Sequence, residues 1–469
     1  MSEKPMAKVK SRLLFLVALL TLAPLLFSAG CNPARSNLAV FNTHFEMHDY
    51  PRAALFAEKK LRIKGNPAGE DLLWALQLAT VERLCQNYQK STQAFDRSED
   101  MLKYYDEQFK IADVISTTVV NDNALPYRGE EYDGIMLNTY KALNFMAEGN
   151  NDLARVEFNR ALDRQRRAKE KFNEEIKKLQ EQLDKNQQAN SADAKSIVED
   201  PNTLTILQDK YPNLYAFEAY PDFVNPFATY MAGVFFNLVG DHAKAVDLLK
   251  ESCGMAKDNP YLADDLLATE EILNKNTPLK GTCWLIFENG LGPVKEEFRI
   301  DLPLFLATNK VRYFGIALPM LKFRDIAYPY LTVDVNGAAY QTRPVADMDR
   351  VIQTEFSKDF KGILTRAVIS ATAKAIAQYA LEDQQNGSWA AMLVAAYSAA
   401  TTAADVRIWT SLPKDFQVAR FQIPKTGKLT ITPPGDSSFD VGIPDCNNMI
   451  VYVRITAKQA VPIWEVISF

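Results

Sequence analysis

Residues 142–161 of this chain read A-L-N-F-M-A-E-G-N-N-D-L-A-R-V-E-F-N-R-A, and residues 233–252 read G-V-F-F-N-L-V-G-D-H-A-K-A-V-D-L-L-K-E-S. Both stretches have a glycine five residues before an alanine. A large apolar residue and a small residue follow that alanine at spacings of four and seven, which places all three on one face of a helix. Glycine supplies the left-handed backbone that ends the preceding helix. The pattern therefore predicts two hairpins of paired helices, each with a glycine at the turn.

Two further copies of the pattern lie nearer the amino terminus, at residues 41–60 and 79–98, where His48 and Gln86 stand in place of the turn glycine. The four copies together resemble the tetratricopeptide repeat, over residues 34–274 with gaps. The resemblance implies that the helix pairs stack into a solenoid, because one pair cannot bury its apolar face alone. It also implies a concave surface that binds a peptide or a partner helix. The alternative is an ordinary helical bundle with a chance periodicity.

The first 30 residues have the pattern of a secretory signal peptide. Basic residues precede an uncharged apolar stretch from Leu13 to Phe27, which is shorter than the roughly 20 residues of a membrane-spanning helix. The following L-F-S-A-G-C, residues 26–31, resembles the bacterial lipobox. The resemblance implies that Cys31 carries acyl chains that hold the mature protein on a bilayer. An ordinary signal peptide cleaved near Ala29 is the alternative.

The residue after the predicted lipidation site is Asn32. In enterobacteria-like lipoproteins, aspartate at this position is the usual signal for retention in the inner membrane. The resemblance therefore implies a lipid-anchored protein of the cell envelope, located at the outer membrane and facing the periplasm.

Charge and composition restrict the partners of the mature chain. The leader carries four basic residues and Glu3, so the whole-chain net charge of −5 leaves −8 on the remainder. A mildly acidic chain gives no electrostatic reason to expect nucleic-acid binding. Its hydrophobic content of 47% is typical of a folded globular protein. The other four cysteines allow three full disulfide pairings, with buried free thiols as the alternative: Cys85, Cys253, Cys283 and Cys446.

Near residue 275 the pattern changes from helical to strand-like. Asn336-Gly337 predicts a hairpin turn, and two helical runs, 348–381 and the uncharged run 389–404, interrupt the strands. The second run is too short for a membrane span, so we predict an Ala-rich helical hairpin packed on a sheet. Short runs rich in Val, Ile, Phe and Trp predict strands at 282–287, 297–302, 312–318, 331–335, 338–342, 416–423, 428–432 and 449–455.

These segments predict an α+β multidomain protein. The leader at 1–30 precedes a tetratricopeptide-like helical domain at 31–274, which includes a charged helix and linker at 164–200. An α+β domain with antiparallel strands and the Ala-rich helical hairpin follows at 275–469. Together with the lipobox and repeats, N-G-L-G-P-V-K at 289–295 and R-I-W-T-S-L-P at 407–413 resemble a family of uncharacterised bacterial envelope lipoproteins with degenerate repeats. That resemblance implies a cell-envelope role and no established reaction.

Two histidines have the spacing of metal ligands. His44 and His48 lie one helical turn apart, but Glu46 between them does not fit the H-E-x-x-H motif of zinc proteases. A third ligand would have to be a carboxylate, since His242 lies far along the chain. We therefore expect histidines that cap or pack, and no metal ion or other cofactor.

A glycine-rich stretch between two predicted strands is a candidate partner-binding loop. Asn289, Gly290 and Gly292 form this stretch, and Lys295 lies at its polar edge. Exposed loops often carry function. A tight turn that joins the two strands is the alternative explanation for both glycines.

Arg407 and Trp409 lie where predicted helix gives way to strand. We interpret them as a structural corner in which Arg407 pairs with Asp405, and a partner-binding surface is the alternative. No G-x-S-x-G, P-loop or Cys–His arrangement occurs in the sequence, so we expect no enzymatic activity.

The sequence as a whole predicts a lipid-anchored scaffold or interaction protein that binds another envelope protein through its helical-repeat surface. The alternative is an envelope hydrolase, or a protein that binds a glycan or small ligand, with its site in the carboxy-terminal domain. A deep pocket in residues 280–469 lined by carboxylates or histidine would favour an enzyme, whereas an open apolar groove along residues 34–274 would favour the scaffold.

Overall fold

A computed structural model describes residues 33–62, 65–111, 125–187, 201–211, 214, 220, 224–275, 279, 281–304, 312–382 and 403–469. Over these residues the fold is mixed α+β, as the sequence predicts. The leader, Cys31, and the uncharged run up to residue 402 lie outside the described residues, and Ala403 and Ala404 at the end of that run are not helical. Within the described ranges, none of the helices combines the length and the apolar character needed to cross a bilayer.

Four helical hairpins form most of the amino-terminal half, and each corresponds to one predicted copy of the repeat. Two more helices, α9 (Pro201–Lys210) and α12 (Pro260–Lys275), lie outside the hairpins. The predicted charged helix is the continuation of α7. The paired helices are α2 (Pro33–Glu46) with α3 (Tyr50–Lys60), α4 (Asp71–Leu84) with α5 (Tyr88–Ile111), α6 (Glu131–Ala147) with α7 (Asn151–Gln187), and α10 (Pro226–Leu238) with α11 (His242–Met255).

All four hairpins have the same turn. In each, the residue at the predicted turn position has a positive φ, and the next N–H donates to the carbonyl five residues before it, with N···O distances of 2.7–2.9 Å. This hydrogen bond satisfies a carbonyl at the end of the first helix. The predicted glycine turns are confirmed, and the two copies without glycine adopt the same backbone. The turn residues and their φ values are His48 (60°), Gln86 (60°), Gly149 (73°) and Gly240 (84°).

Close approach of the paired helices explains the small residues of the pattern. A Cβ added at Gly233 would lie 3.0 Å from the Cγ atom of Leu249 on the paired helix. A bulkier side chain there would push the helices apart. The residues five positions after each turn are all fully buried: Ala53, Ser91, Ala154 and Ala245.

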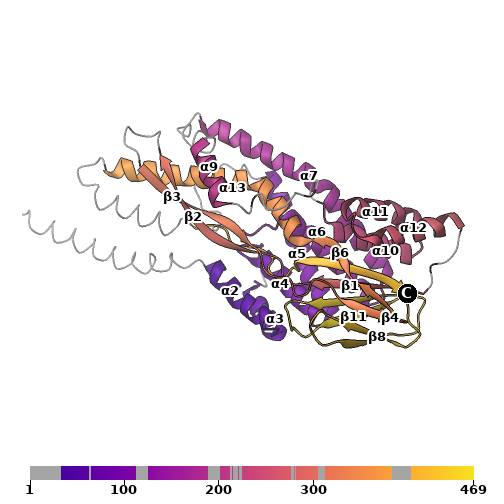
Figure 1. The fold of residues 1–469 in the computed structure, drawn as a ribbon. Helices are drawn as coiled ribbons and strands as arrows, with labels where there is room; N and C mark the ends of the chain where they lie inside the picture. Colours follow the sequence, from indigo (N-terminus) through magenta and orange to yellow (C-terminus); the bar gives the residue numbers. More distant parts are fainter. Residues whose placement is uncertain are drawn as a thin grey trace, which may run out of the picture.

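Each hairpin packs on the next one along the chain. Helix α3 contacts α4, α5 contacts α6, α7 contacts α10, and α11 contacts α12. Figure 1 shows the row of helices running from α2 and α3 on one side of the sheets to α10, α11 and α12 on the other.

The carboxy-terminal half forms three sheets. Their strand orders are β11-β10-β1-β7-β6, β5-β4-β8-β9 and β2-β3. The described strand pairs are antiparallel except β1 with β10, so the expectation of antiparallel strands is wrong for this central pair. The strands are β1 (Thr282–Asn289), β2 (Val294–Leu304), β3 (Arg312–Lys322), β4 (Thr332–Val335), β5 (Ala338–Gln341), β6 (Arg343–Asp347), β7 (Asp415–Gln422), β8 (Lys428–Thr432), β9 (Phe439–Gly442), β10 (Asn448–Ile455) and β11 (Ile463–Ser468).

The five-stranded sheet is covered on both faces. Trp284 and Ile286 of β1 belong to the core shared with the helices, whereas Leu285 and Phe287 belong to the core shared with the four-stranded sheet. Successive side chains of a strand point to opposite faces, so every residue of β1 and β10 is buried. The body of the molecule therefore has three layers: helical repeats, five-stranded sheet and four-stranded sheet (Figure 1).

Strand β2 and strand β3 form a ribbon that extends from this body beside α13 (Met348–Glu382) (Figure 1). Helix α13 confirms the first helix of the predicted Ala-rich hairpin. The Tyr211 ring packs on Phe298 of β2 and on Phe360 of α13, with centroids 5.5 Å and 5.0 Å apart. The ribbon and α13 are thus joined to the helical half through the segment after α9.

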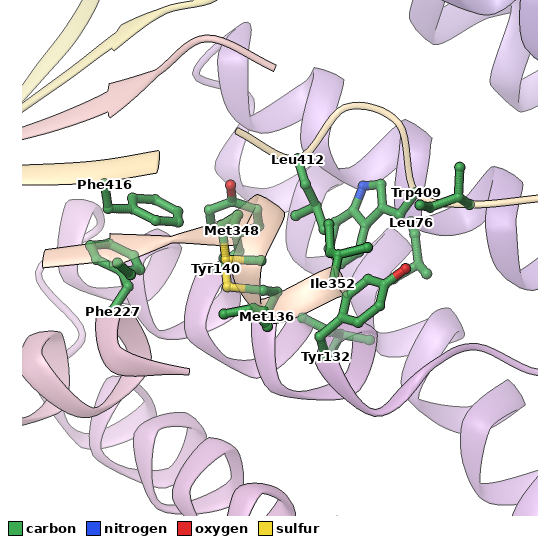
Figure 2. Packing of buried hydrophobic residues seen from close by; sticks show 14 of the residues in the cluster. Leu76, Tyr132, Met136, Tyr140, Phe227, Met348, Ile352, Trp409, Leu412 and Phe416 are labelled. Atoms are coloured by element: carbon green, nitrogen blue, oxygen red, sulfur yellow. The ribbon is translucent and has the colours of Figure 1, made fainter. Parts of the chain in front are cut away.

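Side chains from both sides of the predicted boundary near residue 275 form one hydrophobic cluster. The ring of Phe227 on α10 stacks on that of Phe416 on β7, with centroids 3.6 Å apart and planes 5° apart. Figure 2 shows this pair beside Met136 and Met348, which come from α6 and α13. The helical repeats and the sheet therefore share a core.

Candidate functional site

Residues 403–414, called here the inner segment, pass between the helical repeats and the sheet without regular secondary structure. Trp409 in this segment is 1% exposed, and its indole N–H donates to Thr80 of α4 and to Ser411 at 3.0 Å each. Its ring lies 6.0 Å from those of Phe95 on α5 and Tyr140 on α6, centroid to centroid. Trp409 is therefore held by the second and third hairpins, and Figure 2 shows it beside Leu76 of α4.

Polar side chains on the first two hairpins fix the residues after Trp409. The hydroxyl of Thr410 accepts from Gln77 Nε2 at 2.8 Å and contacts Asn42 Oδ1 at 2.6 Å. Ser411 donates to Gln77 Oε1 at 2.6 Å. Buried polar groups need hydrogen-bond partners, so Asn42 and Gln77 position this part of the chain. The inner faces of α2 and α4 are thus occupied by a segment of the same protein.

Arg407 forms the predicted pair with Asp405. Its Nε and one terminal nitrogen donate to the two carboxylate oxygens at 2.8 Å and 2.7 Å. The other terminal nitrogen donates to the carbonyl of Leu125 at 2.7 Å, and Arg407 is only 3% exposed. Burial lowers the pKa of this guanidinium, but Asp405 more than compensates and raises it. Arg407 therefore binds its own chain rather than an outside partner.

Asn289 and Gly290 form a buried turn at the end of β1. The Asn289 amide donates to the carbonyl of Tyr328 and to Asp415 at 2.9 Å each, and its oxygen accepts two backbone N–H groups. Gly290 has a φ of 59°, and an added Cβ would lie 3.0 Å from the carbonyl oxygen of Asp325. Both residues are needed for the close packing of this turn.

The predicted loop and the predicted corner lie against each other. The N–H of Gly292 donates to the carbonyl of Leu412 at 2.8 Å, and an added Cβ at Gly292 would lie 3.0 Å from the carbonyl oxygen of Pro413. Arg324 joins the two stretches, because it donates to the carbonyls of Gly292 and Thr410. The structure thus brings these candidate residues together in the interior, where they hold the inner segment.

Lys295 is also used within the chain. Its Nζ lies 2.9 Å from Glu130 Oε1 at the start of α6, and its side chain is 9% exposed. Burial lowers the pKa of Lys295, but the charge of Glu130 more than offsets this and raises it. The charged pair therefore joins the ribbon to the third hairpin.

A half-open hollow lies between the second hairpin and the edge of the five-stranded sheet. It has a volume of about 360 Å³ counting its mouth, of which about 20 Å³ admits the centre of a water molecule. The inner space is enough for one water. The lining residues are Thr80, Arg83, Leu84, Gln86, Tyr88, Tyr140, Glu288, Tyr452, Arg454, Ile463, Trp464 and Glu465.

One side of the hollow contains an ion pair between the two halves of the chain. Arg83 of α4 donates to Glu465 of β11, and the hydroxyl of Tyr88 donates to the other oxygen of the same carboxylate. Arg83 also donates to Asn144 at 2.8 Å. Burial lowers the pKa of Arg83, but the charge of Glu465 reverses this and the net shift is upward. Arg83 therefore remains charged.

A second ion pair joins the two central strands. Glu288 and Arg454 are register partners in β1 and β10, and Arg454 donates to Glu288 at 2.5 Å. Tyr140 of α6 donates to the same carboxylate oxygen at 2.5 Å. Burial, with the charge of Glu288, raises the pKa of Tyr140 and Tyr452 well above the usual range. Each carboxylate of the hollow thus has an arginine and a tyrosine as partners, an arrangement suited to joining the halves rather than to acid–base chemistry.

No protein-family model matches this chain. A search of curated proteins also finds no match. Function is therefore inferred from the residues and geometry of the chain itself.

The two histidines considered as metal ligands lie at the end of the first hairpin. His48 occupies the turn, its ring centroid is 6.1 Å from that of Tyr50, and burial lowers its pKa. His44 lies in the last turn of α2. In the described ranges no three His, Cys, Asp or Glu side chains are grouped to hold a metal ion.

The charged residues of the hollow were not among the candidate site residues that the sequence suggested. A signal for two of them is present, because Glu288 and Arg454 each interrupt an apolar run of strand residues. A charge in a strand that is buried on both faces needs a partner. Glu465 also interrupts an apolar run, I-W-E-V-I at 463–467, but its strand lies at a sheet edge, and Arg83 lies in a stretch of mixed polarity that gave no signal.

Proposed function

We propose that this chain is a lipid-anchored scaffold of the bacterial cell envelope, which binds another envelope protein through the outer surface of tetratricopeptide-like repeats. The observation that carries the proposal is the repetition of one hairpin, with the same left-handed turn at four places. Arrays of such hairpins provide extended surfaces for protein binding. We further propose that the hairpins form a solenoid and that the chain belongs to the family of uncharacterised envelope lipoproteins that its sequence resembles.

The lipobox supports the proposed location. Acylation of Cys31 would place the mature chain on a bilayer, and Asn32 favours the outer membrane, on its periplasmic side. The acidic net charge of the mature chain gives no reason to add a nucleic-acid partner.

The surface available to a partner differs from the concave surface that the sequence suggested. The inner segment and the five-stranded sheet cover the inner faces of the repeats, so a partner must bind elsewhere. Leu153 and Val156 on α7 are 43% and 41% exposed, three residues apart on one helix. Exposed apolar side chains of this kind are a natural contact for another protein. The hydrolase alternative draws no support from the hollow, where the carboxylates are paired with arginines.

Crosslinking in intact cells followed by purification tests the proposal. The tagged full-length protein should recover one reproducible envelope protein. The variant Leu153→Arg/Val156→Arg should lose it, because two charges replace the apolar contact. Leu267→Arg, at a position 60% exposed on α12, is the matched control and should retain it. Recovery of no partner, together with a hydrolase activity of the purified chain, would refute the scaffold.

A further inference from the structure

The first hairpin exposes large apolar side chains that packing does not require. Val40 on α2, Met47 at the turn and Leu55 on α3 are 43%, 72% and 55% exposed. The buried stripe of α2, which includes Phe41 and Phe45, faces the second hairpin and the core. The terminal repeat of a solenoid ordinarily presents a polar outer face to water. The exposed apolar side chains of this hairpin therefore need a different explanation.

Basic side chains accompany these apolar ones. Arg35 and Lys59 are exposed, and the Nζ of Lys60 lies 5.2 Å from the ring centroid of Phe56. The acidic Glu46 on the same hairpin is paired with Arg324. Residues 33–60 carry four basic side chains, Arg35, Arg52, Lys59 and Lys60, and three acidic ones, Glu46, Asp49 and Glu58, so the hairpin has a net charge of +1 in a chain whose net charge is −5. Exposed apolar groups mixed with Lys and Arg are typical of surfaces that lie on anionic lipid headgroups.

The chain between the predicted anchor and this hairpin is very short. Helix α2 begins at Pro33, two residues after Cys31, and two residues span at most about 7 Å. An acylated Cys31 would therefore hold the start of α2 against the bilayer. Figure 1 shows α2 and α3 at the periphery of the molecule, at one end of the row of hairpins. A tether of this length gives even a low-affinity contact a high effective concentration.

We propose that the outer surface of the first hairpin is a membrane-docking face, formed by Arg35, Val40, Met47, Leu55 and Lys59. It binds the anionic headgroup region of the bilayer that carries the anchor, and so fixes the orientation of the protein on the membrane. The proposal rests on the lipid anchor of the proposed function, and it adds a second contact that involves no acyl chain. The docked hairpin would direct α10, α11 and α12 away from the bilayer surface.

Vesicle sedimentation of the mature chain with Cys31→Ala tests the docking face without any acyl chain. The protein should bind vesicles of phosphatidylcholine with phosphatidylglycerol, and binding should fall with added salt and on phosphatidylcholine alone. Met47→Glu/Leu55→Glu should lower the partition coefficient by about tenfold, because it removes apolar contact and adds negative charge. Leu267→Glu/Leu273→Glu on α12, at positions 60% and 49% exposed, is the matched control and should bind as the parent does.

Thermal unfolding of each variant checks that these exposed substitutions leave the fold intact. Absence of binding by the parent, or equal loss in the hairpin and control variants, would refute the docking face. The anchor is tested separately by the mass of the amino-terminal peptide from native protein. Binding of the Cys31→Ala chain without an acylated native peptide would refute the anchor and retain the lipid contact.

Discussion

Trp409 and Thr80 lie 329 residues apart in the sequence and share a hydrogen bond of 3.0 Å in the core. This bond joins the carboxy-terminal half of the chain to the second helical hairpin. Because the inner faces of the hairpins are filled in this way, it is their outer faces that remain exposed to solvent.

Two substitutions of Trp409 separate the contribution of its indole hydrogen bond to stability from the contribution of its packed ring. Trp409→Phe keeps much of the ring but leaves Thr80 without the indole donor, and should lower the free energy of unfolding by about 1–3 kcal/mol. Trp409→Ala also creates a cavity and should cost about 3–5 kcal/mol. Urea unfolding followed by circular dichroism measures both. Trp464→Ala, at a position 36% exposed, is the control and should cost less than either; an equal cost would contradict the role given to Trp409.

The ion pair of Arg83 and Glu465 should behave as a buried pair, since their side chains are 6% and 12% exposed. Glu465→Leu leaves the guanidinium without its charge partner and should cost about 3–5 kcal/mol of unfolding free energy. The double variant Arg83→Met/Glu465→Leu removes both charges and should recover part of that loss. A double-mutant cycle by urea unfolding measures the coupling. Additive losses from the single variants would show that the pair does not join the halves.

Asp133 should make stability depend on pH. Burial raises its pKa to about 7 from an ordinary value of 3.8, although it accepts a hydrogen bond of 2.5 Å from the hydroxyl of Tyr127. Because the folded pKa is the higher one, its contribution to stability is full below about pH 4 and is lost as the pH rises to about 7, by up to about 4 kcal/mol.

The variant Asp133→Asn isolates this contribution of Asp133. The decline of the unfolding free energy with pH should become shallower, as measured by urea unfolding at several pH values between about 4 and 8. Asp209→Asn, at an exposed position on α9, should leave the slope as it is in the parent. An unchanged slope in Asp133→Asn would show that the carboxylate is ionised in the folded protein throughout this range.

Two glycines of the fourth hairpin should respond to alanine with opposite signs. Gly240 has a φ of 84° and open space at its Cβ position, so Gly240→Ala should cost about 1 kcal/mol through backbone strain alone. Gly254 is helical, with open space around it, and Gly254→Ala should stabilise the protein by up to about 1 kcal/mol. The thermal unfolding temperatures of the two variants distinguish these opposite effects on stability. Equal effects would mean that the turn tolerates alanine in a left-handed conformation.

The repeats could be predicted because their signal is local. The spacing from the turn residue to Ala154 or Ala245 reports helix packing within one hairpin, and it located all four turns. The central strands could also be predicted, because β1 and β10 each contain a run of five apolar residues, at 283–287 and 449–453. Asn336 and Gly337 form the predicted hairpin turn, with φ of 54° and 83°.

The strands that the sequence did not predict all lie at sheet edges. β6, β9 and β11 each have a neighbour on one side only. β6 and β9 are short and mixed in polarity, and Glu465 divides the apolar residues of β11, so none of the three has the uninterrupted apolar run of a central strand. The path of the inner segment could not be predicted from the sequence either, because the hydrogen bonds of Thr410 to Asn42 and Gln77 join residues more than 300 positions apart.

The parallel pairing of β1 with β10 affects the order in which the central sheet can form during synthesis. Thr282 and Asn448 are register partners 166 residues apart, and β7 on the other side of β1 also comes late in the chain. A polypeptide synthesised amino end first would have its helical hairpins complete while β1 still lacked both neighbours. Products that stop before residue 448 would leave one edge of β1 unpaired, and an open apolar strand edge favours aggregation. Because β10 lies near the end of the chain, the five-stranded sheet can form only when nearly the whole chain is present.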